Sequence, residues 1–306
     1  MSLFQASRCI IAVRVLIGLV CLDTVATSIQ AEEKIIKWRY RAFGLTEKGY
    51  FNLLREHAGP LQPLQSTAVP GLESIEATMP DGTVLKGYRL KATTNGIAKG
   101  ALLAFPGNAQ LCDRLIPELE SIRSAGIDVF AFDYRGLGNS GGKSTFSAIF
   151  ADSRELLSRF ETNGSQRKYL LGISFGGFVL LNALNASNRY DGIIIDSTPA
   201  NVSTALYDRV QPTSRLPTLC SNFFLISGQQ DTIVKPQRMK KLLHLAEERG
   251  AKIWTPATLG HPFDPERQVE NLERLAKIRE FIERTHGKQF VTSSKSSETN
   301  DPPPTK

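Results

Sequence analysis

Short apolar runs alternate with amphipathic stretches between residues 72 and 286. Five runs are almost continuously apolar: GALLAF, IDVFAF, KYLLGI, DGIIID and NFFLIS. Strands that are covered on both faces of a parallel sheet have this composition. The full pattern predicts eight strands, over 72–79, 83–92, 100–105, 127–133, 168–173, 191–196, 222–227 and 252–256.

Helical periodicity fills the intervals between most of these strands. It predicts helices over 109–125, 147–162, 175–187, 236–249 and 266–286. Alternating strands and helices indicate the α/β class, with a mostly parallel eight-stranded sheet and helices on both faces. The Asp81-Gly82 step favours a hairpin between the first two strands, which adds an antiparallel edge. The interval from 197 to 221 is short and rich in proline, so no large insertion fits there.

The first 31 residues have the composition of a secretory signal peptide. Arg8 precedes an apolar run over 9–22, which Arg14 interrupts, and small residues follow. Cleavage is expected after Ala26 or Ala31, which predicts an exported protein, periplasmic or secreted. The alternative is an uncleaved membrane anchor formed by residues 9–22, which would bring the protein into contact with a membrane surface. The run is shorter than the roughly 20 residues that a spanning helix needs.

The remaining chain divides into three parts. Residues 32–71 are expected to form an N-terminal helical extension, with a helix near 45–57 and a proline-containing link. Residues 72–286 form the predicted α/β domain. Residues 287–306 are polar and proline-rich, and they are expected to form a disordered tail.

Charge and cysteine content narrow the range of partners. The 306-residue chain has a formal net charge of +7, but its Lys and Arg residues are scattered among acidic ones. No basic stripe is interleaved with aromatic residues, so nucleic acid is not expected as a partner. Without the signal segment only Cys112 and Cys220 remain, too few for a disulfide framework, and no bridge is expected between them.

Ser174 lies in the segment GISFGG, between a predicted strand and a predicted helix. A tight strand-to-helix turn requires glycine wherever backbones crowd, hence Gly172 and Gly176. Such a turn lifts the serine hydroxyl off the sheet at a helix N-terminus, whose dipole favours negative charge. It also directs the backbone N–H of Phe175 toward a reacting oxygen. This G-x-S-x-G pattern resembles the nucleophile elbow of α/β-hydrolases.

A serine nucleophile needs a base, and the base needs an acid to orient it. Of the four histidines, His261 follows the last predicted strand in a loop, which favours it as the base. His57 precedes the sheet, whereas His244 and His286 lie on predicted helices, where surface roles are expected.

Two aspartates compete for the role of the orienting acid. Asp231 follows the strand over 222–227, in the turn SGQQDTIVKP, and it is favoured. Asp196, at the end of GIIID, is the rival, with a helix-capping role as its structural alternative. Asp264 is too close in sequence to His261 for this role, and it is expected to cap the last helix.

The loop after the strand over 100–105 is expected to supply the second oxyanion donor. In LLAFPGNAQ, the backbone N–H of Asn108 is the candidate, and Gly107 permits a close approach. The full predicted site therefore consists of Ser174, Asp231 and His261 as catalytic residues, with Phe175 and Asn108 forming an oxyanion hole. It contains no metal-ligand cluster, and no metal or organic cofactor is expected.

Together, FPGNA, FDYRGLGNSGG, GISFGG and SGQQDTIVKP followed by LGH resemble the α/β-hydrolase superfamily. The resemblance covers about residues 72–286 and is greatest to the small-lid branch with serine aminopeptidase-like and monoacylglycerol-lipase-like hydrolases and protein depalmitoylases. It implies a Ser174–Asp231–His261 triad and mainly structural roles for Asp133, Tyr134 and Arg135. One departure is Pro106, which stands where the family usually has histidine.

The sequence therefore predicts a serine hydrolase that cleaves carboxylic ester or thioester bonds through an acyl-enzyme. Its substrate would be a small molecule or an acylated molecule. An aminopeptidase or amidase using the same triad is the first alternative, although no residue that would hold a substrate ammonium can be identified. The second alternative is a non-catalytic binding protein with a hydrolase fold, which would be expected to have lost a triad residue.

Overall fold

The protein is described here by a computed structural model that covers residues 35, 46–62, 64, 69–94, 96–162, 166–185, 189–204 and 206–286. The expected signal segment and C-terminal tail lie outside these residues. Within the described part of the chain, no helix has an apolar stretch long enough to cross a bilayer.

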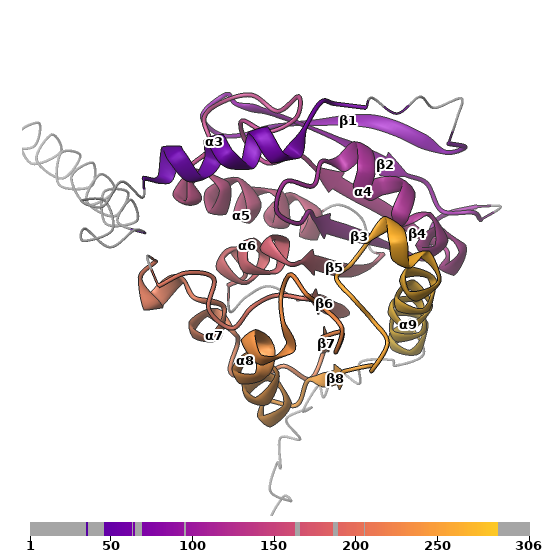
Figure 1. Ribbon diagram of the computed structural model, residues 1–306. Coiled ribbons are helices and arrows are strands. Elements are labelled where there is room, and N and C mark those ends of the chain that lie inside the picture. The colour runs from indigo at the N-terminus through magenta and orange to yellow at the C-terminus, as the bar shows by residue number, and fades with distance from the viewer. Residues whose placement is uncertain are drawn as a thin grey trace, which may run out of the picture.

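A single eight-stranded sheet forms the centre of the molecule (Figure 1). Its spatial order is β1-β2-β4-β3-β5-β6-β7-β8. The β1–β2 and β2–β4 pairs are antiparallel, and every later pair is parallel. The predicted fold class is therefore confirmed. The strands are β1 (Leu72–Thr78), β2 (Val84–Leu90), β3 (Gly100–Phe105), β4 (Ile127–Phe132), β5 (Arg167–Ile173), β6 (Gly192–Asp196), β7 (Phe223–Ile226) and β8 (Lys252–Trp254).

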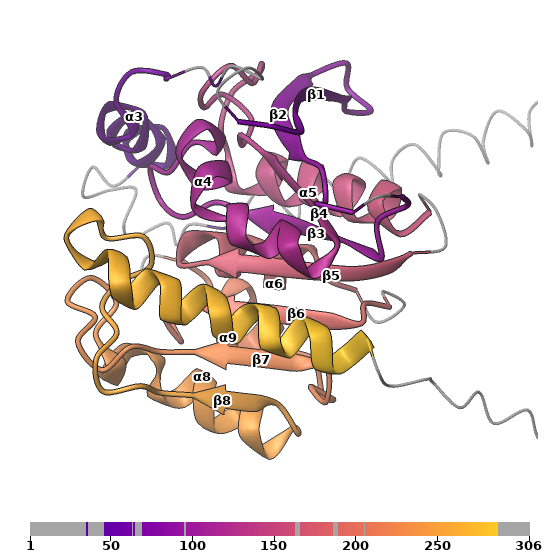
Figure 2. The ribbon, with the colours of Figure 1, turned by 90° about the vertical axis from the view of Figure 1, so that its right-hand side faces the viewer.

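Helices cover both faces of this sheet. Side chains from α3, α5, α6 and α8 pack into one hydrophobic cluster, and those from α4, η1 and α9 pack into a second. Figure 2 shows α9 and α4 lying across one face of the sheet. The helices are α3 (Glu47–Ala58), α4 (Cys112–Glu118), α5 (Phe146–Thr162), α6 (Phe175–Ala183), α7 (Pro212–Arg215), α8 (Pro236–Glu248) and α9 (Gln268–His286), with 3₁₀ helices η1 (Glu120–Ala125), η2 (Asp208–Val210) and η3 (Pro265–Arg267).

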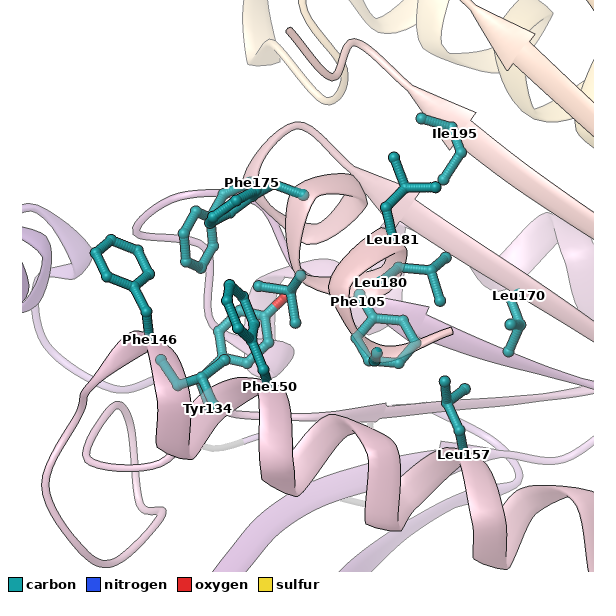
Figure 3. Packing of buried hydrophobic residues seen from close by; sticks show 14 of the residues in the cluster. Phe105, Tyr134, Phe146, Phe150, Leu157, Leu170, Phe175, Leu180, Leu181 and Ile195 are labelled. Carbon is teal, nitrogen blue, oxygen red and sulfur yellow. The ribbon is translucent and has the colours of Figure 1, made fainter. Parts of the chain in front are cut away.

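Alternate side chains of the inner strands enter opposite clusters. In β3, Leu103 and Phe105 belong to the first cluster, whereas Leu102 and Ala104 belong to the second. Both faces are buried, which explains why the strand sequences are continuously apolar rather than alternating. Figure 3 shows part of the first cluster, in which aromatic side chains from α5 and α6 lie against β3 and β5.

The predicted helix over 109–125 is wrong in its details. The segment forms α4 followed by η1, and α4 contains Pro117 near its end. A proline inside a helix removes one backbone donor and crowds the preceding turn, so a continuous helix is not favoured. The helix predicted over 175–187 ends at Ala183. The resemblance implies a short lid over 197–221. The described residues of this interval form η2 and α7, and Leu206, Val210 and Leu216 pack into the first cluster.

The N-terminal extension contributes α3, which is docked on the domain by both polar and apolar contacts. Thr46 caps this helix by accepting a hydrogen bond from the amide of Gly49. Phe51 and Leu54 are buried in the first cluster. Cys112 and Cys220 are both free and buried.

The parallel strands end at a common level. In register, Phe105 pairs with Gly172, Ile173 with Asp196, and Asp196 with Ile226. Residues that directly follow β3, β5, β6 and β7 therefore emerge side by side at one edge of the sheet. This carboxyl edge is where open α/β sheets bind their ligands.

At this edge, α6 begins almost in contact with the backbone of β3. A Cβ atom built on Gly176 would lie 1.9 Å from the carbonyl oxygen of Phe105 and 2.7 Å from that of Pro106. Since neither atom is the end of a flexible side chain, a side chain at position 176 would force the helix away from the strand.

We therefore expect Gly176→Ala to lower the free energy of unfolding by about 1–3 kcal/mol or more, because the added methyl overpacks a rigid contact. The matched control is Gly96→Ala, where a Cβ atom would meet nothing within 4 Å. Urea denaturation of both variants tests this. Equal stability of the two variants would contradict the close approach.

Candidate active site

Ser174 occupies a strained turn between β5 and α6. Its backbone has φ 51° and ψ −111°, in a region that a residue with a side chain rarely adopts. The amide of Ser174 donates to the carbonyl of Asp196 at 2.8 Å, and its carbonyl accepts from the hydroxyl of Thr198 at 3.0 Å. Two contacts from the neighbouring strand end thus hold the turn in place, and the predicted strand–serine–helix arrangement is present.

Two backbone N–H groups near the Ser174 turn form no hydrogen bond among the described residues. They are the amides of Phe175 and Asn108. Phe175 is the first residue of α6, and Asn108 lies in the loop after β3. The close contact of Gly176 with Phe105 and Pro106 brings this loop and the start of α6 together. Two such donors are what an oxyanion hole requires.

The candidate oxyanion loop, residues 106–110, is held by hydrogen bonds with two side chains. The buried Tyr134 hydroxyl donates to the carbonyl of Pro106 at 2.9 Å. The amide of Gly107 donates to the side chain of Gln110 at 3.0 Å. Pro106 stands where the family usually has histidine. The hydrogen bond from Tyr134 holds the backbone at this position.

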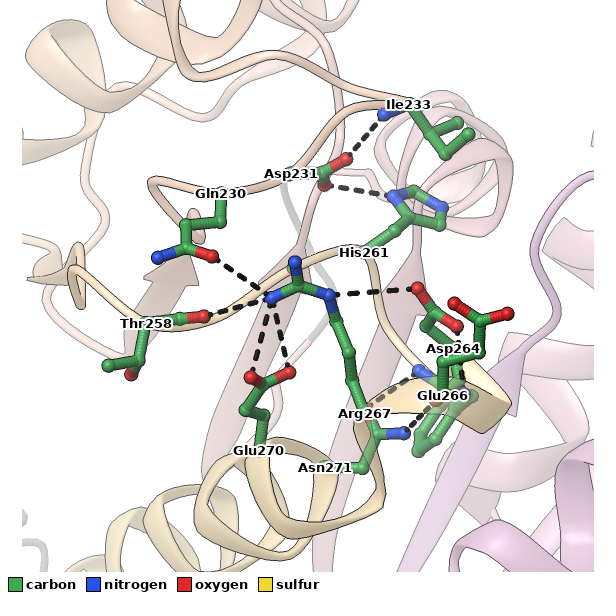
Figure 4. A network of polar contacts seen from close by, with 12 residues as sticks. Gln230, Asp231, Ile233, Thr258, His261, Asp264, Glu266, Arg267, Glu270 and Asn271 are labelled. Atoms are coloured by element: carbon green, nitrogen blue, oxygen red, sulfur yellow. Dashed lines mark hydrogen bonds and ion pairs between the residues drawn. The ribbon is translucent and has the colours of Figure 1, made fainter.

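Asp231 and His261 are hydrogen-bonded to each other, as Figure 4 shows. The distance between His261 Nδ1 and Asp231 Oδ2 is 2.8 Å. The other carboxylate oxygen, Oδ1, accepts from the amides of Ile233 and Val234 at 2.9 and 2.8 Å. The side chain of Asp231 is 1% exposed, whereas that of His261 is 21% exposed. One ring nitrogen of His261 is therefore held by a buried acid.

The pKa of Asp231 reflects two opposing effects. Burial disfavours the ionised carboxyl, but the hydrogen bond and charge of His261, together with the amide of Val234, lower the pKa below its ordinary value. An ionised Asp231 is the form that can orient and stabilise a protonated imidazole.

The loops that carry Asp231 and His261 touch along their backbones. A Cβ atom on Gly228 would lie 2.1 Å from the carbonyl oxygen of Leu259, so only glycine fits there. The amide of Gln230 donates to that same carbonyl at 3.0 Å. Arg267 adds a second link, because its Nη1 reaches both the Gln230 side chain and the Thr258 carbonyl at 3.3 Å (Figure 4).

Asp196 has a different partner from the one considered in the sequence. Its Oδ2 lies 3.0 Å from Nε of Arg274, and both side chains are 1% exposed. The pair is an ionic contact rather than an aligned hydrogen bond, since Arg274 Nε has no hydrogen-bonding partner. Asp196 is thus neither bonded to His261 nor a helix cap. Burial raises the pKa of its carboxyl, while the charge of Arg274 acts in the opposite direction.

Arg274 is the residue that sequence reasoning missed. Its Nη2 donates to the carbonyl of Gly260 at 2.6 Å, directly before His261. Its Nη1 reaches the side chain of Asn271 at 3.2 Å, and that side chain accepts from the amide of Phe263 and donates to the carbonyl of Asp264. The only sequence signal was an arginine at an inward-facing position of an amphipathic helix.

The other three histidines and Asp264 lie on or beside helices, outside the Asp231–His261 pair. Nδ1 of His57 contacts the carbonyl of Leu53 within α3, and the side chain of His244 is 70% exposed on α8. His286 ends α9. Asp264 accepts from the amide of Glu266 and caps η3, the 3₁₀ helix directly before α9, rather than α9 itself.

Ser174 and His261 are brought to the same edge without a direct bond. No hydrogen bond joins the Ser174 hydroxyl to His261 among the contacts of the described residues. They are connected through adjoining strand ends, since Ser174 bonds to Asp196 and the amide of Ser197 bonds to Ile226 at the end of β7. In enzymes without bound substrate, such catalytic hydrogen bonds are often long and tighten on binding.

The described residues form cavities elsewhere in the fold, but no cluster of metal-binding side chains. Two open cavities of about 500 and 430 Å³ lie along β1 and β2, and none of Ser174, Asp231 and His261 lines them. Within the described ranges, no group of three or more His, Cys, Asp or Glu residues is arranged to hold a metal ion.

Comparison with known proteins bears on the family and the fold. The family model described as serine aminopeptidase, S33, matches residues 96–216. The protein YfhR of Escherichia coli K12 is 29% identical over 211 residues, which are 60% of this chain and 72% of YfhR.

Two solved structures share the fold. The esterase Pf2001 of Pyrococcus furiosus superposes with a TM-score of 0.57 and 22% identity, covering 74% of this chain and 99% of its own. An α/β-hydrolase of Vibrio vulnificus superposes with a TM-score of 0.60 and 14% identity, covering 79% of this chain and 94% of its own.

The fold and these matches define a class: the chain has the α/β-hydrolase fold, and its residues 96–216 match the serine aminopeptidase S33 family model. The family match supports a serine hydrolase in general. The matched region contains Ser174 and Asn108 but ends before Asp231 and His261, and it begins after α3.

We expect Arg274→Met to lower the free energy of unfolding by about 3–5 kcal/mol, because it leaves the Asp196 carboxylate buried without its counter-ion. The paired variant Arg274→Met with Asp196→Leu should recover part of that loss, since neither charge of the pair remains. Chemical denaturation measures both.

The control is Arg279→Ala, on the same helix, whose side chain is 37% exposed and 3.9 Å from Glu283. It should change stability by less than about 1 kcal/mol. If Arg274→Met is no less stable than this control, the buried pair does not hold the histidine loop.

Proposed function

We propose that this protein is a serine hydrolase that cleaves carboxylic ester or thioester bonds through a Ser174–His261–Asp231 triad. The observation that carries the proposal is the 2.8 Å hydrogen bond from His261 Nδ1 to the buried Asp231, at the sheet edge where the strained Ser174 turn lies. The two unengaged amides of Phe175 and Asn108 beside that turn add support.

The reaction begins with attack of Ser174 Oγ on the acyl carbon while His261 Nε2 takes the hydroxyl proton. The amides of Phe175 and Asn108 then donate to the oxygen that becomes negatively charged in the tetrahedral intermediate. Asp231 keeps Nδ1 protonated and stabilises the imidazolium. His261 returns its proton to the departing alkoxide or thiolate, and an acyl ester on Ser174 remains.

Water then hydrolyses the acyl-enzyme, with water as the nucleophile and Ser174 as the leaving group. His261 takes a proton from water, and the hydroxide attacks the acyl carbon. The second tetrahedral intermediate collapses with return of the proton to Ser174 Oγ, which releases the carboxylic acid. Every proton is transferred by His261, so the triad is sufficient for both half-reactions.

Amide hydrolysis is the second candidate, and the description of the matching family as a serine aminopeptidase favours it. The two candidates differ in leaving group: a protonated amine must depart in one, an alcohol or thiol in the other. A panel of p-nitrophenyl esters, acyl thioesters and aminoacyl anilides, compared by kcat/KM, ranks them. We expect esters and thioesters to rank above anilides.

We expect the purified protein to react with a fluorophosphonate probe at Ser174 and to hydrolyse short p-nitrophenyl esters. Ser174→Ala should abolish the labelling and lower kcat by roughly 10⁴-fold or more, the scale of losing a triad member. Mass spectrometry of the labelled peptide identifies the modified residue. A Ser174→Ala variant with full esterase activity would refute the mechanism.

Asp231→Asn and Asp196→Asn separate the two acids. Asp231→Asn removes the partner of His261 and should lower kcat by about 10³- to 10⁴-fold with a smaller change in KM. Asp196→Asn leaves the Asp231–His261 bond in place, so its main effect should be on stability. Rates are measured well below each variant's unfolding temperature and divided by the fraction of sites titrated by the probe. A larger loss of kcat in Asp196→Asn would overturn the assignment of the acid.

The predicted export, or anchoring through residues 9–22, stays a proposal, since it concerns residues outside the described part. If the signal is cleaved as expected, N-terminal sequencing of the exported protein should begin at residue 27 or 32.

A further inference from the structure

We propose that Tyr50 on α3 is a positioning residue of the oxyanion loop, so that the N-terminal extension completes the active site. This inference rests on the proposed hydrolase function. It adds a residue that lies outside the predicted α/β domain of 72–286 and outside the region matched by the family model, 96–216.

Tyr50 touches both residues whose amides form the candidate oxyanion hole. Its hydroxyl donates to Oδ1 of Asn108 at 3.0 Å. Its ring lies 6.3 Å, centroid to centroid, from the ring of Phe175, within the range of a favourable aromatic pair. One side chain from a helix 58 residues earlier in the chain therefore bridges the two donors.

The hydrogen bond from Tyr50 holds Asn108, the residue of the oxyanion loop that follows those held by Tyr134 and Gln110. Tyr134 holds the carbonyl of Pro106, and Gln110 holds the amide of Gly107. Asn108 comes next; it is exposed, and the following residue, Ala109, has a φ of 57°. A donor contributes to catalysis only if it is already aimed at the developing oxyanion, so a side-chain anchor on Asn108 preserves the direction of its N–H.

Buried packing and two hydrogen bonds attach α3 to the rest of the domain. Phe51, on α3, is fully buried. Glu47 accepts a hydrogen bond from the amide of Phe146, at the start of α5. Nε of Arg55 donates to the carbonyl of Gly136 at 3.0 Å. Burial also raises the pKa of the Tyr50 hydroxyl, so it remains a protonated donor throughout the physiological range.

The test compares Tyr50→Phe with the wild-type protein in ester hydrolysis. The variant keeps the ring and its contact with Phe175 but loses the hydroxyl. We expect kcat to fall about threefold to tenfold, the scale of one net hydrogen bond, with KM unchanged. The control is Leu53→Ala on the same helix, at a side chain that is 57% exposed, which should leave both constants unchanged.

A double-mutant cycle with Asn108→Ala distinguishes positioning from general stabilisation. Asn108→Ala keeps the backbone N–H but removes the acceptor of the Tyr50 hydroxyl. If Tyr50 acts through Asn108, adding Tyr50→Phe to Asn108→Ala should cause no further loss of kcat. Fully additive losses, or an unchanged kcat in Tyr50→Phe, would overturn the inference.

Measurements on the wild-type protein distinguish failure of this inference from failure of the proposed function. If the wild-type protein neither reacts with the fluorophosphonate probe nor hydrolyses any substrate in the panel, the proposed function fails, and the inference fails with it. If the wild-type protein is active and depends on Ser174, but Tyr50→Phe matches it in kcat, only the role of Tyr50 fails.

Discussion

The geometry of the site depends on one constraint, the parallel register of β3, β5, β6 and β7. Because these strands end at the same level, the residues that follow them emerge at one edge of the sheet. Ser174, the Asp231 turn and the oxyanion loop are each continuations of such strands. A shift of one residue in any pair would turn the following side chain to the opposite face of the sheet. The buried, apolar faces of the sheet hold that register.

Above the strands, direct backbone contact replaces side-chain packing. Gly176 lets α6 meet the end of β3, and Gly228 lets the acid turn meet the loop that carries His261. Both contacts are too short for a Cβ atom. The site is therefore assembled from loops whose spacing is set by the backbone, which gives its donors and acceptors fixed positions before substrate binds.

A buried ionic network supports the histidine side of the site. Arg274 joins Asp196 at the end of β6 to the carbonyl of Gly260, and Asn271 holds the backbone on the far side of His261. Buried charges are costly to desolvate, so such a pair is weak support for stability by itself. Its position beside the two loops suits it to fixing one conformation of the histidine loop.

The sequence alone determined the order of strands and helices and the identity of the local turns. Continuous apolar runs indicated buried parallel strands, and the glycines around Ser174 indicated a tight strand-to-helix turn, because both signals arise within a few consecutive residues. The roles of Asp196, Arg274 and Tyr50 had no comparable signal. The sequence left Asp196 as the rival orienting acid to the favoured Asp231. Its 3.0 Å contact with Arg274, 78 positions later in the numbering, gives it another partner. Tyr50 similarly meets Asn108 across 58 residues. Pairings of this kind are decided by how α3 and α9 pack on the sheet, and tertiary packing is a property of the whole chain that no short segment encodes.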